Sequence, residues 1–216
     1  MVYLQMVDPE RVGVNALSEQ QGPVRKRTYQ KAKRAEDERR TRERIIDAAE
    51  YLHASLGPAR TTVSAVADRA GVTRATVYRH FANEEQLFLA CSRQWLSRQQ
   101  LPDPDAWSLV EDPIERLRTG LGEIYGFYRR GEQMMTHILR DVDVVPAVVV
   151  AARRSREQRW VDTLLTPLPG HRRKLVRAAV AHATTFTTWQ SLCGSQGLSD
   201  RSAVELMTGM VERVLR

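Results

Sequence analysis

Apolar residues recur with helical spacing along most of this chain, and the most informative stretch covers residues 62–81. The apolar positions of its first half are Val63, Val66, Ala67 and Ala70. Their spacing predicts a short helix with one buried face. Gly71 follows, and glycine readily adopts the positive φ of a sharp turn. Val77 and Phe81 then share one face of a second helix, so the pattern is that of a helix-turn-helix.

The second helix of this pattern has a predictable outward face. Because each residue advances a helix by about 100°, the face opposite Val77 and Phe81 centres on Arg79. The other outward residues are Ala75 and Thr76 beside Arg79, with Arg74 and Tyr78 on the flanks. A guanidinium matches the O6 and N7 edge of guanine, and the flanking polar groups suit phosphates. A solvated amphipathic helix with nothing opposite it is the alternative.

Taken together, these residues resemble the signature of the TetR family of transcriptional regulators. The segments that carry the resemblance are Thr61-Thr62, Ala70-Gly71-Val72-Thr73, Tyr78-Arg79-His80-Phe81 and Asn83-Glu84-Glu85-Gln86-Leu87. The match covers about residues 42–88, and its motifs are specific. The resemblance implies that Thr62 touches a phosphate at the start of its helix. It also implies a recognition surface made by Thr73, Arg74, Thr76, Tyr78, Arg79 and His80.

Glu84 departs from the family pattern, in which a lysine or arginine usually opens the fourth helix. A carboxylate suits the positive end of the helix dipole but repels a phosphate. No side-chain contact to DNA is therefore expected from Glu84, although backbone N–H groups there could bind a phosphate. Asn83 and Gln86 have the spacing of a capping box, which favours a structural role for this turn.

The pattern and the resemblance together predict an all-α chain. An N-terminal three-helix helix-turn-helix DNA-binding domain over residues 41–88 is followed by a larger helical effector-binding and dimerisation domain over residues 101–216. The fourth helix is expected to continue to about residue 100. Thr41 is expected to cap the first helix. The apolar positions of that helix are Ile45, Ala48, Ala49, Leu52 and Leu56.

Residues 1–40 are expected to form a basic, flexible arm. Between residues 25 and 44, ten lysines and arginines face four acids, so this segment contributes 10 − 4 = +6 to the chain's net charge of +7. Such a segment could track phosphates or enter a minor groove of DNA. A solvated tail without a partner explains the charge equally well.

Further helices are expected between residues 113 and 165. Apolar residues keep helical spacing over residues 114–128, and again in a second segment over residues 134–139. The apolar run from Val144 to Ala152 contains Pro146, so a bend between two buried helices is expected there.

Two C-terminal segments, about residues 170–194 and 199–215, are apolar on more than one face. In the first, Leu175, Ala179, His182, Phe186, Trp189 and Cys193 form one stripe, and Val176, Val180 and Ala183 form another. A helix buried on two sides needs two partners. The resemblance implies that these last two helices pair with their copies in a homodimer; burial in one monomeric core is the alternative. A dimer would read an inverted-repeat operator in double-stranded DNA.

The resemblance also implies a cavity for a small-molecule effector in the larger domain. Candidate lining residues combine apolar area with a few polar groups, as ligand cavities do: Tyr125, Tyr128, Met134, His137, Ile138, Phe186 and Trp189. Each of them, taken singly, could equally belong to the core of a helical bundle.

Signals for catalysis, metals and membranes are weak. The sequence contains no nucleophile elbow, paired catalytic carboxylates or zinc spacing, so we expect neither an enzyme nor a metal or cofactor. No apolar stretch approaches the roughly 18 residues of a membrane span, and the N-terminus lacks the apolar region of a secretion signal. Cys91 and Cys193 are expected to be buried free thiols, which suits the reducing cytoplasm.

The sequence thus favours a dimeric repressor that an effector releases from its operator. Two other functions stay open. The chain could be an architectural or activating DNA binder that relies on its basic arm and has no effector. It could also be a helical small-molecule-binding protein whose helix-turn-helix no longer binds DNA.

Overall fold

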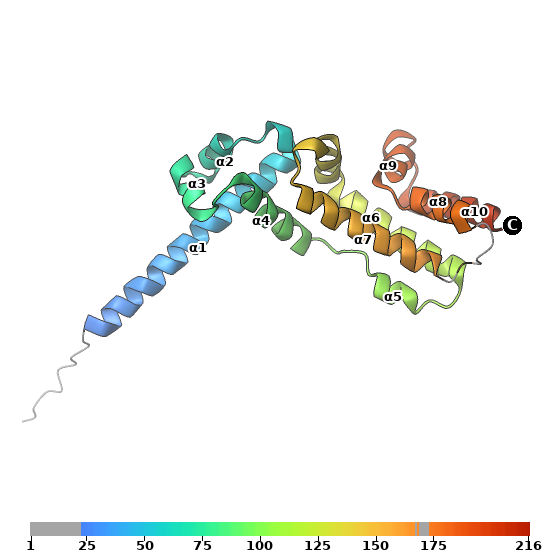
Figure 1. Cartoon of the computed structure of the whole chain (residues 1–216), viewed down its shortest axis with the longest axis horizontal. Helices are drawn as coiled ribbons and strands as arrows, with labels where there is room; N and C mark the ends of the chain where they lie inside the picture. The colour runs from blue at the N-terminus through green and yellow to red at the C-terminus, as the bar shows by residue number, and fades with distance from the viewer. Residues whose placement is uncertain (1–22, 167, 169–172) are drawn as a thin grey trace, which may run out of the picture. The chain divides into compact units, whose positions relative to one another are not determined.

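The computed structural model describes residues 23–166, 168 and 173–216 (Figure 1). Among these residues no strand occurs, and the all-α prediction is confirmed. The α-helices are α1 (Pro23–Ser55), α2 (Val63–Ala70), α3 (Arg74–His80), α4 (Glu84–Ser97), α5 (Pro104–Ser108), α6 (Pro113–Arg140), α7 (Ala147–Leu165), α8 (Arg173–Ala183), α9 (Phe186–Trp189) and α10 (Asp200–Leu215). The shorter turns are the 3₁₀ helices η1 (Pro58–Arg60) and η2 (Val142–Val144) and the π-helical η3 (Gln190–Ser195).

Helix α1 begins at Pro23, so the prediction that Thr41 caps the first helix is wrong. The segment before Thr41 continues the helix because it is rich in Lys, Arg, Glu and Ala, which favour helices. Glu36 adds local support, accepting hydrogen bonds from Arg39 and Arg40 at 2.8 Å each. Thr41–Arg216 form one compact unit, and the helical residues up to Arg40 lie outside it. The first 22 residues of the predicted arm lie outside the described residues.

Side-chain caps and one left-handed glycine shape the helix-turn-helix. Thr62 caps α2 by accepting a hydrogen bond from the Ala65 N–H at 3.1 Å. Gly71 ends α2 with φ 64°, the left-handed conformation that a turn this sharp requires. Thr73 then caps α3. The sharp turn predicted at Gly71 is therefore present, and the two threonine caps flank it.

The start of α4 differs slightly from a capping box. Asn83 caps the helix by accepting from the Gln86 N–H at 2.9 Å. The side-chain oxygen of Gln86 reaches back to the N–H of Ala82 at 3.3 Å, one residue before the cap. Glu84 is exposed at this turn and carries the first charge of α4.

The apolar faces of α1 to α4 form one core. Its members include Ile45, Ala48, Ala49 and Leu52 of α1, Val63, Val66, Ala67 and Ala70 of α2, Val77 and Phe81 of the α3 region, and Leu87, Ala90 and Cys91 of α4. Leu56, predicted to belong to the stripe of α1, lies just beyond the helix and is 41% exposed.

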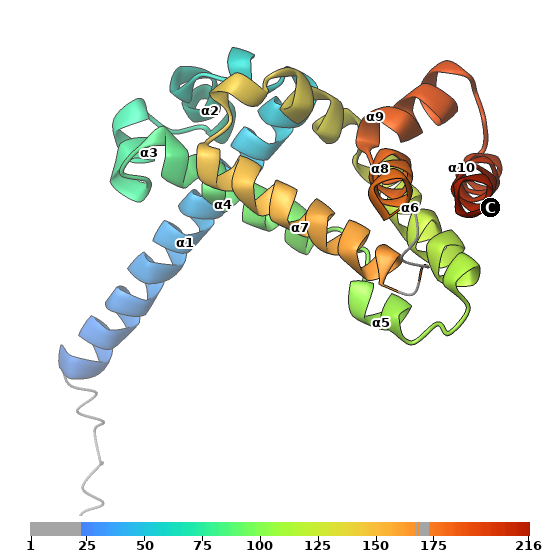
Figure 2. The same cartoon turned by 45° about the vertical axis from the view of Figure 1, so that its right-hand side comes forward.

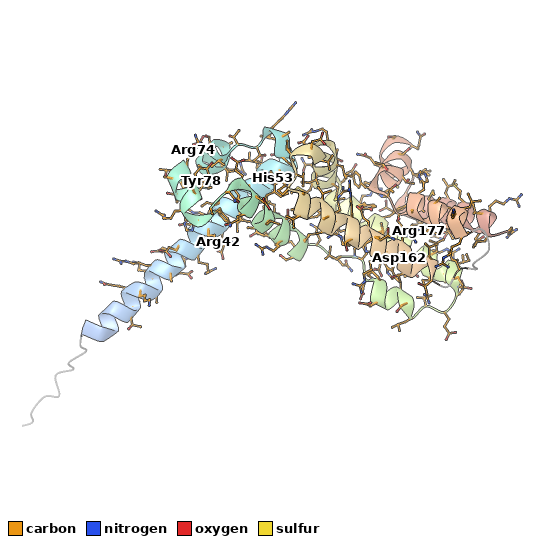
Figure 3. All side chains as sticks on the ribbon, in the orientation of Figure 1. Arg42, His53, Arg74, Tyr78, Asp162 and Arg177 are labelled. Carbon is orange, nitrogen blue, oxygen red and sulfur yellow. The ribbon has the colours of Figure 1, made fainter. Side chains whose placement is uncertain are left out.

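Helix α6 is the centre of the larger helical bundle. It packs against α5, α7, α9 and α10, while α8 packs against α7 and α10 (Figures 1 and 2). An ion pair between Arg177 and Asp162, 2.9 Å apart, joins α8 to α7 (Figure 3). The two segments predicted over residues 114–139 are one continuous helix, Pro113–Arg140.

Glycines keep two large side chains close to α6. A Cβ at Gly120 would lie 2.7 Å from Leu164 and 3.3 Å from the ring of Trp107, and a Cβ at Gly131 would lie 2.9 Å from the ring of Trp95. Gly122 has open space around it. Gly120 and Gly131 therefore allow close packing against α6, whereas Gly122 does not serve it.

The predicted helix over residues 170–194 is broken after Ala183. The carbonyl oxygens of Ala183 and Thr184 accept hydrogen bonds from the hydroxyls of Tyr125 (2.9 Å) and Tyr128 (2.7 Å) on α6. Thr185 then caps α9. Buried tyrosine hydroxyls thus satisfy carbonyl groups that a continuous helix would have bonded itself.

Candidate nucleic-acid interface and cavity

The short helix α3 has one face in the core and one face in solvent. Val77 and Phe81 are only 1% and 2% exposed. The exposed residues of α3 are Arg74, Ala75, Tyr78 and Arg79, and Arg74 and Tyr78 are labelled in Figure 3. Thr76 and His80 are half-buried at the edges of this face. The outward face therefore carries two guanidiniums and one phenol on a single helix.

Threonine hydroxyls mark the start of both helices of the motif. Thr62 and Thr73 are exposed, and the hydroxyl oxygen of each accepts a backbone N–H of its own helix. The Thr73 hydroxyl also lies 3.0 Å from the hydroxyl of Thr76. These caps fix the threonine side chains beside the N–H groups of a helix start, where an anion is favoured.

Three arginines outside α3 extend the basic surface of the motif. Arg42 of α1, labelled in Figure 3, lies over the ring of Phe81 with its guanidinium carbon 4.8 Å from the ring centre. Arg44 lies close to Gly71: a Cβ added at that glycine would be 3.9 Å from Nη1 of Arg44. Arg69 of α2 lies over the ring of Tyr51 at 3.2 Å. From the sequence, Arg42 and Arg44 are only two charges of a basic segment, because contacts between helices leave no periodic signal.

A mostly apolar cavity of about 190 Å³ lies among α1, α4, α6 and α7. Among the residues that line it are Phe88 and Trp95 of α4, Met134 and Ile138 of α6, and Arg156 of α7. Met134 and Ile138 belong to the group that the sequence predicted for an effector cavity. Phe88, Trp95 and Arg156 do not, because only the packing of α4 and α7 against α6 brings them here.

The rest of the predicted cavity group is placed elsewhere. Tyr125, Tyr128 and Trp189 are fully buried. The two tyrosine hydroxyls donate hydrogen bonds to backbone carbonyl oxygens at the end of α8. Phe186 lines a separate hollow beside α7 and α8. His137 bonds the carbonyl oxygen of Ala54 through its Nδ1 at 2.8 Å. The structure therefore divides the predicted group among the core, two surface hollows and the cavity.

His53 and Cys91 form a neutral pair at the cavity wall. The Nδ1 of His53 lies 3.6 Å from the sulfur of Cys91, and the imidazole lies against Phe88 with 4.7 Å between ring centres. Burial lowers the pKa of His53 to about 4 and raises the pKa of Cys91 to about 12. Neither side chain is charged near neutral pH. Cys91 and Cys193 are both free and buried, as predicted.

The end of α6 is tied to the loop between α1 and α2. Arg140 donates to the carbonyl oxygen of Leu56 at 2.9 Å, and Asp141 accepts from the Ala59 N–H at 3.1 Å. The hydrogen bond from Arg140, together with that from Ala59, lowers the pKa of Asp141 to about 2. The helix that lines the cavity thus contacts the chain segment leading into α2.

In the described part of the chain, no three side chains of His, Cys, Asp or Glu are grouped closely enough to hold a metal ion. None of the helices there has the length and apolar character needed to cross a membrane.

Comparison with known proteins gives a consistent result. Residues 45–91 match the family model described as bacterial regulatory proteins, tetR family. The chain is 36% identical over 86 residues to a probable acrEF/envCD operon repressor of Escherichia coli (strain K12), and the match spans 38% of each chain. The chain therefore covers less than half the length of this relative.

Solved structures of similar fold extend over most of the chain. A TetR-like transcriptional regulator from Rhodococcus sp. RHA1 has a TM-score of 0.60 and 20% identity, over 81% of this chain and 95% of that one. AibR, solved with isovaleryl coenzyme A and operator DNA, has a TM-score of 0.58 and 20% identity, over 79% and 97%. At this identity the likeness concerns the fold.

The low pKa of His53 predicts a pH-dependent stability. The unfolded histidine takes up a proton below pH 6.5, whereas the folded one stays neutral until about pH 4. The free energy of unfolding is therefore highest above pH 6.5 and decreases as the pH falls towards 4. The decrease due to His53 is on the order of 3 kcal/mol in total. Urea unfolding at pH 7 and pH 5 measures it. His53→Met should flatten this slope, and a slope that survives the substitution contradicts the assignment; His182→Met, at an exposed histidine, is the control.

Proposed function

We propose that the chain is a transcriptional regulator of the TetR family that binds operator DNA through α3. The observation that carries the proposal is the outward face of α3. Its inner side chains, Val77 and Phe81, are buried, so Arg74, Tyr78 and Arg79 project together into solvent. A short helix with this face fits the major groove of DNA.

Each exposed group of the motif has a proposed role at the DNA. Arg79, at the centre of the outward face, reads a guanine through O6 and N7. Ala75 lets the helix approach the bases closely. The groups proposed to contact phosphates or the edge of the groove are Thr62, Thr73, Arg74, Thr76, Tyr78 and His80. Phosphate contacts fix the register of the helix, so the specificity rests on Arg79 and its nearest neighbours.

We propose a homodimer formed by α8 and α10. Both helices keep apolar or small residues on the surface although their other faces are buried: Leu175, Ala178, Leu206, Gly209 and Met210 are exposed. The two helices pack against each other, so this apolar surface is continuous. A second copy covering the same surface gives a two-fold axis, and two copies of α3 then read an inverted repeat.

An effector in the cavity would act by population shift. The cavity walls come from α1 and α4, which share the core of the DNA-binding helices, and from α6 and α7. A ligand that favours one arrangement of these helices changes the fraction of dimers with correctly spaced recognition helices. AibR, of similar fold, has been solved with both a small molecule and operator DNA, which supports this proposal. The name of the Escherichia coli relative supports repression as the output.

Replacing Arg79 tests the DNA-binding assignment. Arg79→Ala should weaken binding to the operator by about 1–3 kcal/mol and relax base preference at one position of each half-site, because a bidentate contact to guanine is lost. Fluorescence anisotropy on duplexes with single base changes measures both effects. Arg154→Ala, at an exposed arginine of α7, is the control and should bind like the parent. Unchanged affinity and base preference in the Arg79 variant would remove this role.

Placing a charge on the α8–α10 surface tests the dimer. Leu206 is 45% exposed, and Leu206→Glu should yield monomers, because two carboxylates would be buried against apolar partners. Leu109→Glu is the matched control, since Leu109 is 82% exposed and lies after α5. Light scattering coupled to gel filtration gives the mass of each. Dimers of the Leu206 variant that persist at micromolar concentration would contradict this interface.

A further inference from the structure

The cavity among α1, α4, α6 and α7 has an uneven distribution of charge. Its walls are mainly aromatic, aliphatic and methionine side chains. Among the described residues no aspartate or glutamate lines it, whereas three arginines do: Arg93, Arg153 and Arg156. Arg93 is exposed, so the charge within the cavity comes from the two arginines of α7.

Arg153 and Arg156 share one nearby carboxylate. The Nη1 of Arg153 lies 3.4 Å from Oε1 of Glu157, and Glu157 is also the acid whose charge acts on Arg156. This group of three side chains therefore has a net charge of +1 when all are ionised. Burial lowers the pKa of Arg156 and raises the pKa of Glu157, so both charges are held at a cost in solvation.

Arg156 has an unused donor. Its Nε is buried and has no hydrogen-bond partner among the described residues. The side chain also lies 5.9 Å from the ring centre of Trp160, which holds the guanidinium against an aromatic surface. A buried donor without a partner is unfavourable, and more so when it is charged. A ligand that accepts this hydrogen bond would recover that energy.

The opposite wall carries no compensating charge. His53 and Cys91 are neutral near pH 7, and they lie beside the ring of Phe88. Apart from the exposed Arg93, the α1 and α4 side of the cavity is thus mainly apolar, and the α7 side is cationic. A ligand that matches both ends has an apolar body and an anionic group.

We propose that this cavity binds an apolar carboxylate, with its carboxylate hydrogen-bonded to Arg156 and its hydrocarbon part against Phe88 and Met134. This inference rests on the proposed function, because it names the chemical class of the effector. A cationic ligand would be repelled by the net charge of +1 on the group of Arg153, Arg156 and Glu157. A neutral ligand with a hydroxyl oxygen could accept from the Nε of Arg156, but it would not supply the negative charge that makes such a hydrogen bond strong. A carboxylate supplies both the charge and the acceptor atoms.

Three probes of equal chain length test the charge preference on the unmodified protein. Octanoate, 1-octanol and octylammonium are titrated at pH 7 by isothermal calorimetry, with the thermal unfolding midpoint as a second readout. Octanoate should bind at least tenfold more tightly than 1-octanol, and octylammonium most weakly. Equal binding of octanoate and 1-octanol, or no binding of octanoate, overturns the inference.

Replacing Arg156 tests whether the preference for a carboxylate depends on this side chain. Arg156→Met keeps a long apolar side chain. It should weaken the binding of octanoate at least tenfold and change the affinity for 1-octanol less than threefold. Arg154→Met removes a charge from an exposed position two residues away and should leave both affinities unchanged. If Arg156→Met does not fold, Arg156→Gln provides the same comparison with a polar group retained. Octanoate binding that is insensitive to Arg156 overturns the inference.

Operator binding without any probe is measured in parallel. If the protein does not bind operator DNA, the proposed function is contradicted. If it does, but the affinities for the three probes rank differently from the expected order, only the ligand class is contradicted.

Discussion

The burial of Val77 and Phe81 holds the recognition helix in place. Helix α3 has only seven residues, and an isolated helix of that length is not stable in water. Its orientation therefore comes from these two side chains in the core shared with α1, α2 and α4, and from the cap at Thr73. Because one face is fixed in this core, Arg79 lies on the opposite face, and Arg74 and Tyr78 are exposed on its flanks. The proposed DNA contacts all depend on this packing.

The same core also connects the DNA-binding helices to the cavity. Phe88 and His53 line the cavity, and they belong to α4 and α1, which pack around α2 and α3. Arg140 and Asp141 add polar contacts from α6 to the loop that precedes α2. A ligand that moves α4 or α6 must therefore disturb either the packing around α3 or the hydrogen bonds at this loop. This gives the proposed population shift a physical route within the compact unit.

Local signals in the sequence were sufficient for the helix-turn-helix. Helical periodicity, the caps at Thr62 and Thr73 and the turn at Gly71 are all determined within a few residues. The start of α1 was misplaced because Thr41 has the chemistry of a cap but lies inside a segment with strong helix propensity. The break after Ala183 was missed because it depends on the hydroxyls of tyrosines more than 50 positions away.

The cavity was harder to predict for the same reason. Periodicity shows that Tyr125 and Met134 are both apolar positions of α6, but it does not show which neighbouring helix each one meets. Tyr125 faces the end of α8, whereas Met134 faces α4 and α7. Arg156 was not singled out from the sequence, because its unpartnered Nε is a property of the packed structure.

The most direct test of this account is selection of duplexes from a random DNA library by the full-length protein. The account predicts enrichment of an inverted repeat whose half-sites are about 10 base pairs apart from centre to centre, or a multiple of that spacing, because two copies of α3 read two half-sites. Enrichment of a single asymmetric site, or no enrichment beyond a general preference for DNA, would contradict it.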